Sequence, residues 1–121
     1  MRFEAARLFN SLKATIPDLK ATVVIFGTGE FEFHRSPGFD FDADTFAAEY
    51  TTLFRIAQRT AEDTELGDAS EQILITERSV LLARRIRGEG IAVFLCGTNE
   101  HLGRLRYEVR MLIRKTEQYI A

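Results

Sequence analysis

The longest regular pattern of hydrophobic and polar positions runs from Asp42 to Gly67. Apolar residues recur there at intervals of three and four, the spacing of one face of a helix. These residues are Phe46, Tyr50, Leu53, Phe54, Ala57 and Ala61. Asp42 is the predicted N-cap, and Gly67 is the predicted C′ residue that ends the helix. About 24 residues give a helix about 36 Å long, whereas a chain of this length has a radius of gyration of about 14 Å. We therefore expect the helix to cross the whole domain and to brace a sheet.

Two further segments have the apolar spacing of a helix. Residues 2–15 precede Pro17-Asp18, which is predicted to end the first of them. Its apolar positions are Phe3, Ala6, Leu8, Phe9 and Leu12. Residues 100–119 form the second, in which Leu102, Leu105, Val109, Leu112 and Ile113 are expected to be buried. Its remaining side carries the stripe Arg106, Arg110 and Arg114, which predicts a solvated face with salt bridges.

Five shorter segments have the composition of strands. Residues 20–26 and 30–34 flank Gly27-Thr28-Gly29 and are expected to form a hairpin. Three strands are predicted after the long helix, at 72–76, 79–86 and 91–96. The last of these is the most apolar and is therefore expected to be central, with a hairpin loop at 87–90 before it.

The predicted element order is α-β-β-α-β-β-β-α. Several strands are apolar on both faces, so helices must cover both sides of one antiparallel sheet. The expected fold is α/β, a three-layer α/β/α sandwich with a single five-stranded antiparallel sheet. Its 121 residues fit one domain, over 1–121.

The cysteine content and the length of the apolar runs indicate the compartment in which the protein is expected. Cys96 is the only cysteine, lies in an apolar run, and is expected to be a buried small hydrophobic residue. The sequence shows no leader, and its longest apolar run is far shorter than the roughly 20 residues that span a bilayer. We expect a cytoplasmic protein with no membrane partner. The formal net charge is −2, but residues 78–121 hold 9 basic and 4 acidic residues; we expect this asymmetry to be neutralised within the fold.

Candidate catalytic and ligand-binding residues are few. His34 and His101 are expected at the surface, and no His, Cys or carboxylate spacing predicts a metal site. The Gly27–Gly29 turn precedes a strand rather than a helix, unlike a dinucleotide-binding loop, and no phosphate-binding P-loop is present. The sequence therefore predicts no cofactor and no enzymatic activity.

Arginines cluster near the end of the chain. Arg78, Arg84, Arg85 and Arg87 are expected around the hairpin at Gly88. A nucleic-acid-binding domain is normally basic overall and carries aromatic stacking partners on the same face. This chain has a pI of about 5.7 and no aromatic residues interleaved with the arginines, so nucleic acid is not an expected partner.

One predicted strand indicates self-association. The strand with Gln72, Ile73, Leu74, Ile75 and Thr76 comes first in the run that leads to the central strand, so it is expected at the sheet edge. No proline or charge interrupts its apolar middle, and open apolar edges are normally covered. A second copy that pairs there, with its long helix against the first, would continue the sheet in a symmetric dimer.

Over residues 8–120, the order of elements and several local patterns resemble the Roadblock/dynein light chain family. The patterns are Leu12…Ile16-Pro17, Gly27-Thr28-Gly29-Glu30, Asp42…Phe46-Ala47-Ala48, Leu66-Gly67, Ile73–Ile75 and Leu102-Gly103…Arg106. The resemblance implies a homodimer, or a heterodimer with a Roadblock paralogue, in which one ten-stranded sheet continues across two chains.

The resemblance also implies a function. Members are non-catalytic platforms that bind Ras-like small GTPases and regulate their hydrolysis or localisation, or that serve as subunits of motor complexes. The expected contact is the solvent side of the long helix, at Glu49, Thr52, Arg55, Gln58, Arg59 and Glu62. An activating protein would reposition the switch residues of the GTPase or supply an arginine in trans. A structural adaptor and a small-ligand sensor remain alternatives.

Overall fold

A computed structural model of the chain describes residues 3–88 and 90–120. Arg2 in the first predicted helix and Glu89 in the predicted 87–90 loop lie outside these residues. The elements follow the predicted order. They are α1 (Ala5–Lys13), β1 (Leu19–Phe26), β2 (Phe31–Arg35), α2 (Ala43–Asp63), β3 (Glu71–Ile75), β4 (Val80–Ile86), β5 (Gly90–Cys96) and α3 (Leu102–Ile120). The five strands form one antiparallel sheet in the order β2-β1-β5-β4-β3, which confirms that the most apolar strand is central and that β3 is an edge.

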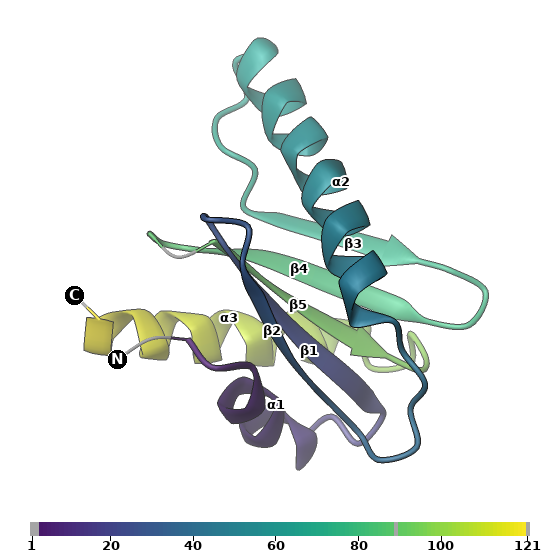
Figure 1. Cartoon of the computed structure of the whole chain (residues 1–121). Helices are drawn as coiled ribbons and strands as arrows, with labels where there is room; N and C mark the ends of the chain where they lie inside the picture. The colour runs from purple at the N-terminus through teal and green to yellow at the C-terminus, as the bar shows by residue number, and fades with distance from the viewer. Residues whose placement is uncertain (1–2, 89, 121) are drawn as a thin grey trace.

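Helices cover both faces of this sheet, as predicted. Helix α2 lies on one face, and α1 and α3 lie on the other (Figure 1). Successive residues of a strand point to opposite faces, so Val23 and Val93 belong to the core beneath α2 while Val24 and Phe94 belong to the core against α1 and α3. The two cores explain why β1 and β5 are continuous apolar runs rather than alternating ones.

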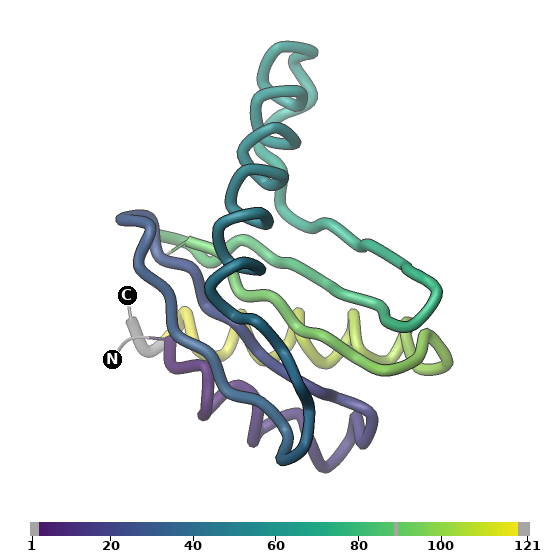
Figure 2. Tube along the Cα trace, turned by 45° about the vertical axis from the view of Figure 1, so that its right-hand side comes forward, coloured from purple at the N-terminus to yellow at the C-terminus, as the bar shows by residue number. Residues whose placement is uncertain are grey.

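Helix α2 does not brace the sheet along its whole length, and the expectation that it would is wrong. Its buried residues are Ala43, Ala47, Tyr50 and Phe54, all in the first twelve positions. Figures 1 and 2 show its C-terminal half rising away from the sheet. Beyond Phe54 the predicted apolar face offers only the methyl groups of alanines, whose burial contributes little. Leu53, predicted to be buried, is 39% exposed.

The end of α2 also differs from the prediction. The left-handed C′ residue is Glu65, with φ 58°, rather than Gly67. The Leu66 N–H donates to the Ala61 carbonyl at 2.9 Å, and the Glu65 N–H donates to the Glu62 carbonyl at 3.1 Å. This pair of bonds is a Schellman motif. A glycine two residues later therefore did not identify the helix end.

Helix α1 is fixed to the sheet by a charged side chain. The Lys13 ammonium group donates to the carbonyls of Pro17 at 2.7 Å and Leu19 at 2.8 Å. These bonds attach the C-terminal end of the helix to the start of β1. Ala5 rather than the predicted Ala6 is buried.

The structure confirms the prediction for the single cysteine. Cys96 is buried, and burial raises the pKa of its thiol to about 12. The thiolate is therefore scarce at neutral pH, and the residue acts as a packing group. Among the described residues, no helix has the length and apolar content needed to cross a membrane.

Candidate functional site

The candidate site is a groove of about 410 Å³ between α2 and one end of the sheet. The sheet contributes the end of β1 and the start of β5, and α2 contributes one wall. Four of the six residues predicted to bind a partner line this wall: Arg55, Gln58, Arg59 and Glu62. The other lining residues are Ile25, Phe26, Gly27, Thr51, Phe54, Arg85, Gly90 and Ile91. Glu49 and Thr52, the remaining two predicted residues, are exposed on α2 but do not line the groove.

Helical spacing explains why this wall carries these side chains. Arg55, Gln58, Arg59 and Glu62 are three or four positions apart, so they lie next to one another on one side of α2. This side is adjacent to the buried stripe that contains Phe54. The wall is therefore polar along its rim and apolar where it meets the sheet.

Gln58 holds the wall in place and is only partly exposed. Its side-chain amide donates to Glu62 at 2.7 Å and to Asp68 at 3.0 Å, and its carbonyl accepts the backbone N–H of Ala69 at 2.9 Å. The same carbonyl accepts a bond from the guanidinium group of Arg85. Gln58 thus links the overhanging part of α2 to the segment before β3, whereas the prediction placed it on a freely solvated face.

Arg85 was missed as a member of this site because it was grouped with its arginine neighbours in sequence. Its Nε donates to the Ala69 carbonyl at 2.8 Å, and its guanidinium carbon lies 5.8 Å from the centre of the Phe54 ring. Strand alternation places Arg85 on the α2 face and Arg84 on the other, which is the signal that would have separated them. Arg78, expected near Gly88, lies instead in the turn between β3 and β4.

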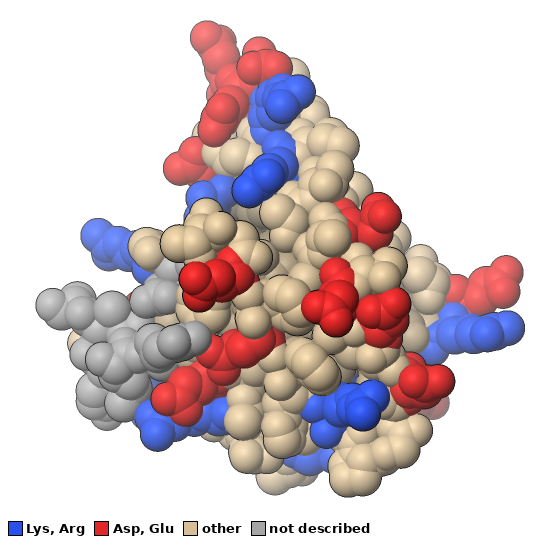
Figure 3. Space-filling view, viewed as in Figure 1, with Lys and Arg blue, Asp and Glu red and all other residues tan. Residues whose placement is uncertain are grey.

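The arginines on the rim are available for a partner. Arg55 and Arg59 are exposed, and neither side chain has a hydrogen bond or an ion pair with any other described residue. Figure 3 shows basic and acidic side chains next to one another on the projecting upper part of the molecule, where α2 lies. The rim can therefore contact a surface that carries both charges.

Gly90 sets the close approach of the strands at the base of the groove. Its φ is 138°, and a Cβ atom at this position would lie 2.0 Å from the carbonyl oxygen of Ile25. Backbone atoms of β1 cannot move away without breaking the sheet, because Gly90 pairs directly with Phe26. Only glycine fits here.

Strand β3 leaves part of its apolar surface uncovered. Ile73 packs against the core on the α3 face, whereas Leu74 is 41% exposed and Ile75 is 53% exposed. Gln72 accepts a hydrogen bond from the Tyr50 hydroxyl group, and burial raises the pKa of Tyr50 to about 12, so that hydroxyl stays protonated. Thr76, the last residue of the predicted strand, lies in the following turn and is exposed.

The histidines do not converge on a site. His34 is half-buried, with its ring 4.8 Å from that of Phe9, and His101 is exposed at the start of α3. Over residues 3–88 and 90–120, no three His, Cys, Asp or Glu side chains come together as metal ligands would.

Several solved structures share this fold. A Roadblock/LC7 domain from Streptomyces avermitilis is 18% identical, over 92% of each chain, with a TM-score of 0.75. The gliding protein MglB from Thermus thermophilus is 14% identical, over 98% of this chain and 93% of the other, with a TM-score of 0.75. An MglB structure with a tetrameric arrangement is 14% identical, over 98% and 92%, with the same TM-score. No protein-family model and no curated protein sequence matches the chain. The structural likeness shows that this chain has the Roadblock fold.

Proposed function

We propose that this chain is a dimeric, non-catalytic regulator that binds a Ras-like small GTPase in the cytoplasm and modulates its GTP hydrolysis or localisation. The observation that carries the proposal is the Roadblock fold, shared over more than nine-tenths of the chain with MglB and a Roadblock/LC7 domain. The groove beside α2, with two unpaired arginines on its rim, supplies a surface on which such a partner can dock.

The contact surface combines an apolar floor with a charged rim. Phe26, Phe54 and Ile91 form part of the floor, and Arg55 and Arg59 stand above it. Protein interfaces commonly combine an apolar centre with arginine at its edge. The predicted residues Glu49 and Thr52 extend this surface along the exposed side of α2.

Repositioning of the GTPase's own switch residues is the mechanism that this geometry supports better than an arginine supplied in trans. A catalytic arginine must be held rigidly at the phosphates. Arg55 and Arg59 belong to the overhanging part of α2 and have no supporting partner among the described residues. Arg85 is held rigidly, but its guanidinium is already bonded to Gln58 and to the Ala69 carbonyl.

The dimer uses a second surface, formed by β3 and the neighbouring side of α2. Leu74 and Ile75 on β3, and Leu53 and Ile56 on α2, are between 39% and 54% exposed. Gln72, Ile73 and Thr76 complete the predicted edge. Pairing of two β3 edges would cover these side chains and satisfy the open backbone groups of the strand. A tetrameric arrangement of MglB, which shares the fold, agrees with self-association.

The test is a pull-down with the Ras-like GTPases encoded by the source genome, each loaded with GDP or with a non-hydrolysable GTP analogue. We expect capture of one GTPase, and loss of capture with Arg55→Glu combined with Arg59→Glu, because charge reversal replaces two favourable contacts by repulsion. Arg104→Glu combined with Lys115→Glu is the matched control, since both residues are exposed on α3 and away from the groove and the net charge changes equally.

The nucleotide dependence separates the alternatives. Preference for the GTP form indicates an effector or an activating protein, which a turnover assay then distinguishes. Capture independent of nucleotide indicates a structural adaptor. A folded dimer that captures no GTPase contradicts the proposal, and the ligand-sensor alternative would then be tested at the groove.

A further inference from the structure

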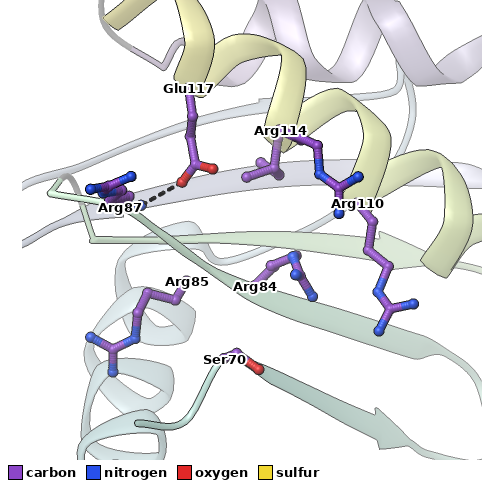
Figure 4. Close-up of a pocket in the computed structure, with 8 residues that line it drawn as sticks. Ser70, Arg84, Arg85, Arg87, Arg110, Arg114 and Glu117 are labelled. Carbon is purple, nitrogen blue, oxygen red and sulfur yellow. Dashed lines mark hydrogen bonds between the residues drawn. The ribbon is translucent and has the colours of Figure 1, made fainter. Parts of the chain in front are cut away.

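A second cavity, of about 250 Å³, lies between β4 and α3, on the face of the sheet opposite to α2. Five of its eight lining residues are arginines, and one is acidic. They are Ser70, Arg84, Arg85, Arg87, Arg110, Ile113, Arg114 and Glu117 (Figure 4). Arg85 directs its guanidinium group to Gln58 on the α2 side, so four arginines contribute positive charge to this cavity.

The acidic residues nearby do not neutralise these arginines. Glu71 lies within 2.7 Å of Arg84, 2.5 Å of Arg106 and 3.7 Å of Arg110, so one carboxylate is shared by three guanidinium groups. The Glu71 side chain is only 11% exposed, and its position beneath them leaves an excess of positive charge. The salt bridges predicted for the arginine stripe of α3 are therefore present at Arg106 and Arg110, whereas Arg114 has none among the described residues.

Two of the arginines have no side-chain partner within residues 3–88 and 90–120. The guanidinium groups of Arg87 and Arg114 make no hydrogen bond or ion pair there. Glu117, the acidic residue of the lining, accepts the backbone N–H of Arg87 at 2.8 Å, as the dashed line in Figure 4 shows. Even with Glu71 and Glu117 counted, the arginines around the cavity outnumber the carboxylates, so a bound anion would stabilise this cluster.

We propose that this cavity binds a phosphate group of a small phosphorylated ligand. A dianionic phosphate supplies the charge that Arg87 and Arg114 lack, and its oxygens match the forked geometry of guanidinium groups. Ser70, which also lines the cavity, carries a hydroxyl group that is a further donor. A volume of about 250 Å³ admits a phosphate group together with a small organic group attached to it, and it is the size of a small-ligand site rather than of a channel for an extended nucleic acid strand.

This site shares only Arg85 with the groove of the proposed GTPase contact, and the guanidinium group of Arg85 is bonded on the α2 side. Arg87 lies at the β4–β5 hairpin, and Arg110 and Arg114 belong to α3. None of the three lines the groove beside α2. The failure of one proposal therefore leaves the other unaffected.

Isothermal titration calorimetry of the full chain with inorganic pyrophosphate, at low ionic strength, tests the proposal. We expect saturable binding of one anion per chain. Arg87→Gln combined with Arg114→Gln should weaken it by about tenfold or more, because charge-assisted hydrogen bonds are lost. Arg78→Gln combined with Arg104→Gln is the matched control: it changes the net charge equally, at exposed arginines outside the cavity, and should leave the dissociation constant within about twofold.

Three outcomes would overturn the proposal. They are the absence of saturable binding, an equal loss of affinity in the control variant, and binding of a dicarboxylate such as glutarate as tightly as pyrophosphate, which would assign the site to an acidic protein segment. Thermal melting in the absence of the anion shows whether each variant is folded. The cavity variant should melt no lower than the wild type, since it removes repulsion, and Arg114→Gln alone provides a milder variant for the same titration.

Discussion

Thr22 is the buried polar residue that stands out in the core. It lies on β1 between His34 of β2 and Phe94 of β5, and it is fully buried. Its hydroxyl oxygen has no hydrogen-bond partner among the described residues. A buried hydroxyl without a partner loses its hydration and gains nothing in return. Thr22 therefore weakens the sheet it belongs to.

We expect Thr22→Val to raise the free energy of unfolding by about 1 kcal/mol, because a methyl group of similar shape replaces the unpaired hydroxyl. Chemical denaturation monitored by circular dichroism measures the change. Thr22→Ser is the matched variant: it keeps the hydroxyl, removes the methyl group, and should lower stability. A Val variant less stable than the wild type would show that the hydroxyl has a partner.

Single residues also mark the limit of sequence-based prediction. The spacing of Arg55, Arg59 and Glu62, which are four and three positions apart, placed them together correctly on one side of α2. The bonds of Gln58 could not be predicted in the same way, because Ala69 and Arg85 are 11 and 27 residues away in the chain. Ile25 and Ile91 were assigned to the core by their apolar strands, and only the three-dimensional structure shows that they also form the floor of a groove.

At the scale of elements, the C-terminal end of α2 is the least favourable part of the helix. Glu65 has a left-handed backbone conformation that costs a residue with a Cβ atom about 1 kcal/mol relative to glycine. Its negative charge also lies close to the negative end of the helix dipole. Both effects act at one position.

We expect Glu65→Gly to raise the free energy of unfolding by about 0.5–1 kcal/mol. Glu65→Gln removes the charge but keeps the Cβ atom, so the difference between the two variants isolates the backbone contribution. Thermal or urea unfolding measures both. If the Gly variant gains no more than the Gln variant, the backbone of Glu65 is unstrained and this account is incorrect.

The positions of the elements were predictable because their signals are local. Apolar runs, glycine turns and helical spacing identified all eight elements in order, and the apolar character of residues 91–96 identified the central strand. The tilt of α2 was not predictable, because it depends on how far its buried stripe extends over a sheet assembled from distant segments. The cavity between β4 and α3 was not predictable either, because these two elements are separated in the sequence by β5 and meet only in the folded chain.

At the scale of the whole molecule, the apolar side chains on β3 and α2 predict the oligomeric state. We expect analytical ultracentrifugation to give a dimer, and Leu53→Glu combined with Ile75→Lys to give a monomer, because each substitution places a charge in an apolar interface. Both positions are exposed in the single chain, so the variant should still fold.

Met111→Glu serves as the control for this prediction. Met111 is 44% exposed on α3, on the opposite face of the sheet from α2, and its substitution should leave the dimer intact. A monomeric wild type, or a double variant that remains dimeric, would contradict the assignment of the interface to β3 and α2.

Because the C-terminal turns of α2 project beyond the sheet, their local stability can differ from the stability of the whole domain. Residues up to Phe54 are packed on the sheet and open only when the whole domain unfolds, whereas the turns beyond Phe54 are held mainly by the hydrogen bonds of Gln58 and can open locally at a much lower free energy. Arg59 and Glu62 lie in that second part. Amide hydrogens along this one helix should therefore exchange with solvent at graded rates, and the tip can adjust to a partner's surface while the core stays closed.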